Sequence, residues 1–178
     1  QIVASGPDDE DQTIKMGCLK MSSQAKESIY IQTPYFIPDE SLHEMLKIAV
    51  LSGVKVKIMI PSKPDHPFVY RATEYFAKDI VEYGAEVYMY QNGFLHSKVM
   101  VVDDEIVSVG TANMDVRSFK LNFEINAFIY DRDVAEELIA NFDEDQKNCI
   151  RATHDYFAKQ SKWRKFKQAF SRLLSPIL

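Results

Sequence analysis

The chain has no run of 18 apolar residues, so no segment of it is predicted to cross a membrane as a helix. A signal peptide is not recognisable either. The two cysteines, Cys18 and Cys149, have neither metal-site nor disulfide spacing, and we expect free thiols in a reducing compartment. There are 178 residues, of which 46% are hydrophobic and 26% charged. This composition is typical of a single globular domain, which we assign to residues 1–178.

Acidic residues are absent after Asp155, although the chain as a whole has a net charge of −5. The acidic excess argues against a non-specific nucleic-acid binder, which needs basic surface to neutralise phosphates. We therefore expect no nucleic-acid partner. The basic end is compatible with an anionic membrane surface as a partner. Its cations are Lys159, Lys162, Arg164, Lys165, Lys167 and Arg172.

Hydrophobic periodicity and turn residues predict alternating strands and helices after a mobile end at residues 1–12. The predicted strands are 28–33, 54–60, 85–90 and 122–130, and the predicted helices are 14–27, 40–53, 68–84 and 132–148. Asp39 is expected to cap the helix that follows it, and Gly53 and Gly84 to end two helices. This order predicts an α/β fold with a mixed β-sheet flanked by helices on both faces.

A basic amphipathic segment, 156–178, is predicted to close the chain, with its helix running to about residue 174. Its apolar stripe comprises Trp163, Phe166, Phe170, Leu173 and Leu174. A helix of this kind either lies on a bilayer or packs its aromatic side chains on the domain.

The stretch FLHSKVMVVDDEIVSVGTANMD, residues 94–115, has the pattern of a β-hairpin with polar residues near its open end. A two-residue turn at Asp104-Glu105 would place Lys98 opposite Thr111 and His96 opposite Asn113. An imidazole, an ammonium, a hydroxyl and an amide would then lie within a few ångströms of one another. A three-residue turn would shift the register by one and break these pairs.

Such a cluster suits an anionic substrate and a nucleophile. Lys98 and the Asn113 amide can donate hydrogen bonds to phosphoryl oxygens. Neutral His96 offers a ring nitrogen for attack, provided that an acceptor holds its other nitrogen, and Glu124 is the best candidate for this acceptor. Asp103 lies roughly 23 Å along a straight strand from His96, so we interpret it as a turn or fold carboxylate.

The full pattern, His-x-Lys-x4-Asp-x6-Gly-Thr-x-Asn, is expected by chance in a chain of this length with a probability on the order of 10⁻⁵ or less. It resembles the signature of the phospholipase D superfamily, the HKD motif. The segments TPYFIPD, GTANMDVRSFKLNFEINAFIYD and SRLLSPIL are similar to the C-terminal half of bacterial cardiolipin synthases. The likeness covers essentially residues 26–178, and it implies a phospholipase D-like half-domain.

The resemblance implies catalytic residues among His96, Lys98, Asp103, Asn113 and Glu124. His96 would form a phosphohistidine, and Lys98 and Asn113 would bind phosphoryl oxygens. Thr111 stands where many members have serine, and we count it with the substrate-binding residues. Tyr35, in TPYFIPD, is either a further substrate-binding residue or a buried aromatic of a helix-entry loop.

Members of this superfamily use two HKD motifs at one site, whereas this chain has one. The expected partners are therefore an N-terminal HKD half of a longer parent chain, or a second copy in a homodimer. The reaction implied is the synthesis of cardiolipin from two phosphatidylglycerol molecules, by a domain at the surface of the bacterial cell membrane. Two alternatives are a phospholipase, phosphodiesterase or nuclease of the same superfamily, and an inactive module that binds anionic headgroups.

No cofactor is expected, and no histidine, cysteine or carboxylate set has metal-ligand spacing. The remaining histidines, His43, His66 and His154, have no partner spacing and are predicted to lie on the surface or in loops.

Overall fold

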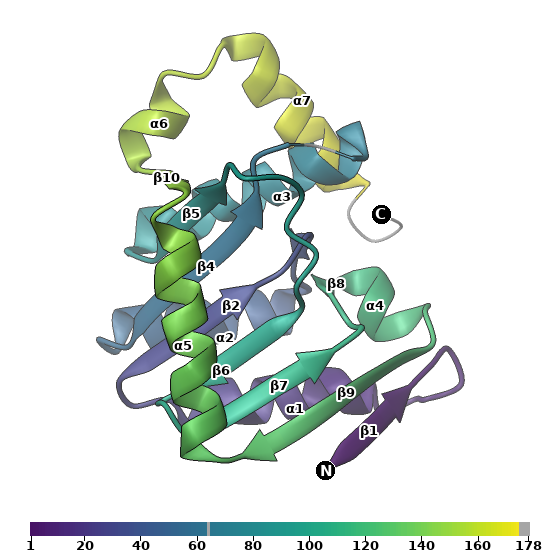
Figure 1. The fold of residues 1–178 in the computed structure, drawn as a ribbon. Coiled ribbons are helices and arrows are strands. Elements are labelled where there is room, and N and C mark those ends of the chain that lie inside the picture. The colour runs from purple at the N-terminus through teal and green to yellow at the C-terminus, as the bar shows by residue number, and fades with distance from the viewer. Residues whose placement is uncertain (64, 175–178) are drawn as a thin grey trace.

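The computed structural model describes residues 1–63 and 65–174 (Figure 1). Its centre is an eight-stranded mixed sheet in the order β1-β9-β7-β6-β2-β4-β5-β10. These strands are β1 Ile2–Ser5, β2 Ser28–Gln32, β4 Lys55–Pro61, β5 Glu86–Tyr90, β6 Val99–Val102, β7 Ile106–Gly110, β9 Glu124–Tyr130 and β10 Cys149–Arg151. Strands β2, β4 and β5 are parallel to one another, and the other neighbouring pairs are antiparallel.

Helices cover both faces of this sheet, which confirms the predicted fold class. The helices are α1 Thr13–Gln24, α2 Glu40–Leu51, α3 Pro67–Tyr83, α4 Val116–Lys120, α5 Arg132–Gln146, α6 His154–Ala158 and α7 Lys162–Leu173. Figure 1 shows α5 crossing one face, while α1, α2 and α3 lie behind the other. A small parallel pair, β3 Phe36–Ile37 with β8 Met114–Asp115, stands beside the main sheet.

The predicted helix boundaries have clear local causes. The Asp39 side chain accepts the Leu42 backbone N–H at 3.0 Å and so caps α2, as expected. Gly84 follows α3 with a φ of 113°, and Gly53 follows α2 with a φ of 91°. Both conformations are left-handed and favour glycine at the end of a helix.

Apolar side chains of the central strands hold the sheet between its helices. Ile29, Ile31, Ile58 and Met100 are fully buried, with 0% of each exposed. Burying one such side chain stabilises the fold by about 1.5–3 kcal/mol. Because a slip of one residue would turn these side chains to the opposite face, their burial fixes the strand register.

The prediction of a mobile end at residues 1–12 is wrong. Strand β1 pairs antiparallel with β9, with Val3 opposite Asn126 and Ser5 opposite Glu124. Backbone N–H and C=O groups along β9 would otherwise be unpaired, and Val3 also packs against the core.

The predicted single helix near the C-terminus is instead two helices, α6 and α7. Ser161 begins the second one, because its hydroxyl accepts the Arg164 backbone N–H at 3.2 Å. Residues 175–178 of the predicted segment lie outside the described residues. Cys18 and Cys149 are free thiols, as predicted. Within the described chain, no helix has the length and apolarity needed to cross a membrane.

Candidate active site

The hairpin exists as predicted, but its turn has three residues. Val102 pairs with Ile106 and Val99 pairs with Val109, which leaves Asp103, Asp104 and Glu105 in the turn. The φ angles of Asp103 and Asp104 are 52° and 53°, a left-handed conformation that Asp tolerates better than most residues. The predicted two-residue turn is therefore wrong.

The cross-strand pairs that depended on that turn are wrong as well. Lys98 lies opposite Gly110 rather than Thr111, and its carbonyl accepts the Gly110 backbone N–H at 3.3 Å. His96 and Lys98 precede β6 and do not belong to it. The candidate residues therefore meet through the ends of several strands instead of through two facing strands.

One end of the sheet gathers these strand ends (Figure 1). Strands β2 and β7 finish there, and β6 and β9 begin there, since Gln32 pairs with Val99 and Gly110 pairs with Asn126. The loop after β2, the segment before β6, the loop after β7 and the first residue of β9 thus converge. Binding sites in open α/β sheets commonly lie at the carboxyl ends of parallel strands.

Lys98 and two carboxylates form the electrostatic centre of this end. Burial lowers the pKa of Lys98, and the negative charges of Glu124 and Asp115 act in the opposite direction. Burial raises the pKa of Asp115, while hydrogen bonds from Ser118 and Asn113 oppose that rise. The Lys98 ammonium can bind a phosphoryl group through charge-assisted hydrogen bonds.

Tyr35 and Asn113 line one pocket, so the structure brings the predicted Tyr35 to the site. The pocket has a volume of about 210 Å³, and it is lined by Tyr35, His66, Val69, Asn113, Asp115, Arg117 and Asn122. The Tyr35 hydroxyl donates to Asp65, and burial together with this hydrogen bond raises the pKa of Tyr35. The phenol therefore stays protonated at neutral pH, and its single proton is donated to Asp65.

Thr33 ties the two sides of this pocket together. This fully buried residue follows β2; its hydroxyl donates to the Tyr35 carbonyl at 2.9 Å and accepts the Met114 backbone N–H at 3.2 Å. The pairing of β3 with β8 continues the connection, with Phe36 opposite Met114. Two short segments that are distant in sequence are thereby held in one place.

Gly110 of the motif is required by a close backbone approach. A Cβ atom there would lie 2.2 Å from the Ile125 carbonyl oxygen, which is far inside van der Waals contact. Asn126 supports the same approach, because its Oδ1 accepts the Ala112 backbone N–H at 3.2 Å and its Nδ2 donates to Ser108 at 3.0 Å. These contacts position the loop that carries Asn113.

The His96 side chain is exposed at this end of the sheet. Its imidazole packs near the Phe94 ring, with 5.9 Å between centroids, and its carbonyl accepts a hydrogen bond from Lys98 Nζ at 2.8 Å. Glu124 Oε1 accepts from Asn122 Nδ2 at 3.1 Å. Across residues 1–63 and 65–174, no hydrogen bond joins the His96 ring to Glu124, so the orienting role of Glu124 stays a prediction.

Thr111 contacts backbone rather than the other candidate side chains. Its hydroxyl accepts the Ile125 N–H at 2.9 Å, and its own N–H donates to the Ile125 carbonyl at 2.9 Å. The residue holds the start of β9, which carries Glu124, in register with the loop after β7. A direct contact of Thr111 with substrate stays a prediction.

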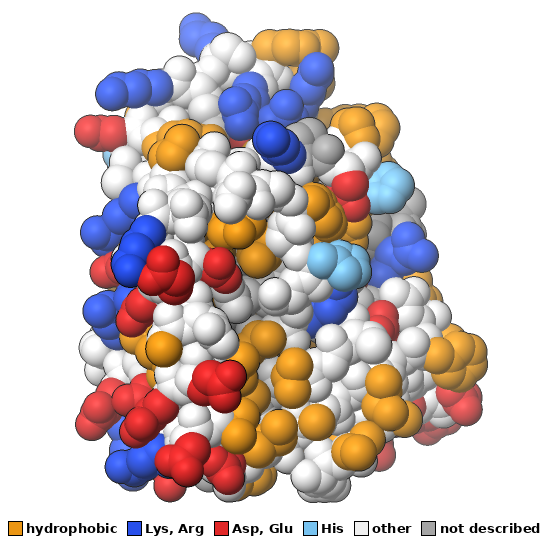
Figure 2. All heavy atoms as spheres, viewed as in Figure 1, with side chains coloured by type: hydrophobic (Ala, Val, Ile, Leu, Met, Phe, Trp, Pro, Cys, Tyr) orange, Lys and Arg blue, Asp and Glu red, His pale blue; other side chains and the backbone are white. Residues whose placement is uncertain are grey.

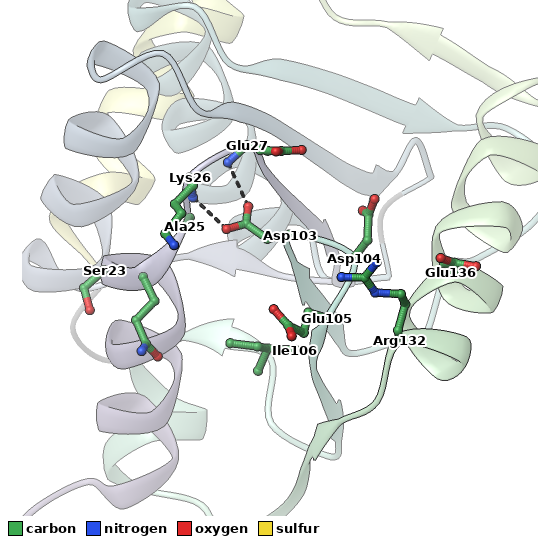
Figure 3. A pocket seen from close by; sticks show the side chains of 11 residues that line it. Ser23, Ala25, Lys26, Glu27, Asp103, Asp104, Glu105, Ile106, Arg132 and Glu136 are labelled. Carbon is green, nitrogen blue, oxygen red and sulfur yellow. Dashed lines mark hydrogen bonds between the residues drawn. The ribbon is translucent and has the colours of Figure 1, made fainter.

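Asp103 lies at the opposite end of the sheet, as the strand-length argument predicts. Its carboxylate accepts the backbone N–H groups of Lys26, Glu27 and Ser28 at 2.7, 2.9 and 2.9 Å. Figure 3 shows two of these hydrogen bonds beside the turn that also contains Asp104 and Glu105. The cavity there, of about 710 Å³, is therefore separate from the candidate active site.

Sequence reasoning missed several residues of the site pocket, namely His66, Asp115, Arg117 and Asn122. Asp115 had a detectable signal, because Asp is a preferred residue at the start of a helix, and Asp115 caps α4 by accepting the Ser118 backbone N–H at 2.6 Å. His66 is exposed, as predicted, but it also lines the pocket. His154 is exposed, as predicted.

The prediction that His43 lies on the surface or in a loop is wrong. Its side chain is buried in α2, and its Nε2 lies 2.7 Å from Asp79 Oδ2 of α3. The partner is 36 positions away in sequence, a distance at which no local spacing pattern could indicate it. In the described part of the chain, no group of three or more His, Cys, Asp or Glu side chains is arranged to hold a metal ion.

Comparison with known proteins shows which family this chain resembles. The family model described as "Cardiolipin synthase, PLD-like domain" matches residues 19–146. The whole chain is 59% identical to a cardiolipin synthase of Listeria monocytogenes serotype 4a and 58% identical to the major cardiolipin synthase ClsA of Bacillus subtilis strain 168. It spans 37% of the length of each of these two relatives.

Solved structures share the fold at low sequence identity. A phosphatidylserine synthase from Haemophilus influenzae matches with a TM-score of 0.78 at 17% identity, over 100% of this chain and 47% of that one. Nuc, a phospholipase D family member from Salmonella typhimurium, matches with a TM-score of 0.74 at 21% identity, over 86% of this chain and 97% of that one. Together with the family match, these likenesses confirm the predicted resemblance: the chain belongs to the phospholipase D-like domain family of the cardiolipin synthases.

Proposed function

We propose that this chain is the C-terminal catalytic half of a bacterial cardiolipin synthase, which converts two phosphatidylglycerol molecules into cardiolipin and glycerol. The observation that carries the proposal is the 58–59% identity to cardiolipin synthases over the whole chain. The candidate active site supports it, because an ammonium and an amide beside an exposed imidazole suit attack on a phosphodiester.

In this reaction a neutral ring nitrogen of His96 attacks the phosphorus of the first phosphatidylglycerol. A P–N bond forms while the P–O bond to the terminal glycerol breaks, and glycerol leaves with a proton that a general acid supplies. The free primary hydroxyl of the second phosphatidylglycerol then attacks the phosphorus and gives its proton to a base. The P–N bond breaks, and cardiolipin and free His96 remain.

In this proposal the other candidate residues bind the substrate or orient the His96 ring. Lys98 neutralises phosphoryl oxygens, and Asn113 lies beside it in the same region of the site. The Oδ1 atom of Asn113 is buried and has no hydrogen-bond partner among the described residues. Tyr35 lines the pocket wall, and Thr111 belongs to the substrate-binding loop. In this proposal Glu124 turns from Asn122 to the His96 ring when substrate is bound.

The proposal also names the partners. A second HKD motif, from an N-terminal half of a longer chain or from a second copy, supplies the general acid, and no cofactor or metal ion takes part. The substrates are phosphatidylglycerol and related anionic phospholipids, so the domain works at the bacterial cell membrane. Among the relatives, the chain's 37% share of their length supports a missing half.

The proposal is tested on the longer protein that contains this chain, in vesicles that contain phosphatidylglycerol. Cardiolipin and glycerol should appear in equal amounts, and His96→Gln should lower the rate by about 10⁴-fold or more. The matched control is His154→Gln, which changes an exposed imidazole on α6 and should retain full activity.

Product analysis discriminates between the alternatives. Phosphatidic acid in place of cardiolipin would identify a phospholipase, cleaved DNA a nuclease, and headgroup binding without turnover an inactive module; each result would overturn the proposal. Phosphate-labelled lipid should leave a covalent adduct on the wild-type protein. The same adduct on the His96→Gln variant would show that another residue is the nucleophile.

A further inference from the structure

Helix α7 carries an apolar stripe that faces away from the domain. The stripe repeats at helical spacing, and its side chains are substantially exposed. These aromatic side chains therefore do not pack on the domain. The stripe consists of Trp163 (64% exposed), Phe166 (59%), Phe170 (47%) and Leu173 (74%).

The face of α7 that packs against α3 is polar instead. Glu74 of α3 is fully buried and forms an ion pair with Arg164, and Gln168 donates to Glu74 Oε2 at 3.2 Å. Gln168 and Ser171 are themselves almost fully buried. Because these polar contacts fix the rotation of α7, the apolar stripe is held outward.

Phe68, at the start of α3, extends the stripe into a groove. The groove has a volume of about 370 Å³ and is lined by Pro67, Phe68, Arg71, Trp163, Phe166, Lys167, Phe170 and Ser171. Phe68 is 57% exposed, and Trp163 stacks on Phe166 with 5.5 Å between ring centroids. The exposed aromatic surface therefore spans two helices and is larger than a few scattered side chains.

Cations surround this surface. With 100° of rotation per residue, Lys162 and Lys167 fall on opposite sides of the apolar stripe, and Lys167 Nζ lies 5.3 Å from the Trp163 ring centroid. Six Lys and Arg residues and no acid follow Asp155. Figure 2 shows Lys and Arg side chains gathered over α6 and α7, whereas acidic side chains gather over α5.

The surface also adjoins the candidate active site through α3. Pro67 and Phe68 line the groove, whereas the neighbouring His66 and Val69 line the site pocket that contains Asn113. A flat surface in contact with the groove would therefore lie next to the site pocket.

We propose that the stripe of α7, together with Phe68, docks the domain on the surface of an anionic lipid bilayer. Trp and Phe beside Lys are the residues that membrane interfaces favour, whereas the cores of protein–protein interfaces are depleted of Lys. The aromatic side chains enter the interfacial layer, and the flanking cations contact lipid phosphates. This inference deepens the proposed function by naming the surface that meets the lipid, but it requires only negative lipid charge and no turnover.

Trp163 is the sole tryptophan of the chain, so its fluorescence reports on this surface alone. The 178-residue chain is titrated with vesicles of phosphatidylserine and phosphatidylcholine in equal parts, and with phosphatidylcholine alone. We expect a blue shift of the emission and quenching by brominated lipid with the anionic vesicles. Both effects should weaken as salt is added, because salt screens the cations.

The variant Phe166→Ser/Phe170→Ser removes two aromatic side chains and keeps Trp163 as the reporter. Its vesicle affinity, measured by flotation, should fall by about tenfold or more. The matched control is Leu51→Ser/Tyr130→Ser, which removes two side chains that are 70% and 68% exposed elsewhere. The control should bind like wild type, and so should His96→Gln.

Four results would overturn the docking proposal. The first is an equal loss of vesicle affinity in the control variant, and the second is vesicle binding without a change in Trp163 emission. The third is a blue shift that depends on protein concentration in the absence of vesicles, and the fourth is no vesicle binding at all. The third result would assign the surface to a second copy of the chain. Failure of docking alongside cardiolipin synthesis by the longer protein would leave the proposed function intact. Docking without any cardiolipin synthesis would overturn the proposed function alone.

Discussion

The Asp103 carboxylate accepts the backbone N–H of Ser28 at 2.9 Å and so joins the β6–β7 turn to the first residue of β2. Lys26 and Glu27 donate to the same carboxylate. The motif thus contains one residue whose contacts lie at the end of the sheet remote from His96. Its charge organises the backbone, whereas the candidate active site lies at the other end of the sheet.

The first prediction is that Asp103→Asn weakens the fold without touching the reaction. Asn keeps one acceptor oxygen and tolerates the left-handed backbone, but it loses the charge that strengthens three hydrogen bonds. The free energy of unfolding should fall by about 2 kcal/mol, which lowers Tm by about 6 °C. Asp104→Asn, in the same turn, serves as the control and should melt like wild type. An Asp103→Asn protein that melts normally yet has no activity would show that Asp103 acts on the chemistry.

The second prediction concerns Glu124 and the pH dependence of turnover. Its negative charge raises the pKa of Lys98 against the opposing effect of burial. Glu124→Gln removes that support, so the pKa of Lys98 should fall further. In the longer protein, the alkaline limb of the pH–rate profile should move to lower pH, and turnover should drop. Glu105→Gln, at the opposite end of the sheet, should leave the profile in place; a Glu124→Gln profile identical to wild type would contradict the assignment.

The third prediction uses the buried carboxyl of Asp115. Burial raises its pKa in the folded state above the ordinary value of 3.8, so the folded protein binds this proton more tightly than the unfolded chain. The stabilisation is fully present below pH 3.8 and is lost as pH rises through the folded-state pKa. In the Asp115→Asn variant this side chain does not ionise, so the variant does not lose this stabilisation as pH rises. The Asn oxygen can still accept the Ser118 N–H.

The stability of Asp115→Asn relative to wild type should therefore increase as pH rises from about 4 to neutral. Chemical denaturation at several pH values measures this difference. A stability difference that is constant over this range would mean that the folded protein does not bind the Asp115 proton more tightly than the unfolded chain.

Hydrophobic periodicity was enough to predict elements that bury a regular face, such as β2 with Ile29 and Ile31. It could not predict the length of the hairpin turn. Asp103, Asp104 and Glu105 all suit turns, so turns of two and of three residues are equally compatible with the sequence. The structure has the three-residue turn, in which the Asp103 carboxylate accepts three backbone N–H groups. Likewise, β1 is too short and too close to the edge of the sheet to give a periodic signal.

The candidate site was predictable where its residues belong to the motif, as Lys98 and Asn113 do. The rest of the pocket depends on the pairing of β3 with β8, two residues each, which no periodic pattern indicates. The orientation of α7 was equally hidden. Its sequence contains both an apolar stripe and polar residues, and the contacts of Arg164 and Gln168 with Glu74, 90 and 94 positions away, decide which face is covered.

The fourth prediction tests that contact. Glu74 is fully buried between Arg71, at 2.5 Å, and Arg164. Glu74→Gln leaves two cations without a partner charge, so the free energy of unfolding should fall by about 3 kcal/mol. Glu82→Gln on the same helix breaks an exposed pair with Lys78 at 3.6 Å, and it should cost less than about 1 kcal/mol. Equal losses in the two variants would argue against a polar anchor for α7.

The fifth prediction, which rests on the proposed function, is that the isolated 178-residue chain is inactive as a monomer. A phosphohistidine route needs a neutral nucleophile and a protonated acid at the leaving oxygen at the same time. One imidazole cannot hold both protonation states. Lys98 is a poor acid here, because its positive charge is needed on the phosphate. Under the proposed function, the site is therefore incomplete until a second motif faces His96.

Turnover by this chain alone should consequently depend on its own concentration. It requires two copies that meet with His96 facing His96 across a two-fold axis, and a mixture with the His96→Gln variant should lose activity faster than the wild-type fraction falls. Size-exclusion chromatography and the cardiolipin assay are run on the same sample. A clean monomer that transfers phosphatidyl groups at the rate of the longer protein would show that one motif suffices. Asp115, whose buried carboxyl has a raised pKa, would then be the first residue to test as the acid.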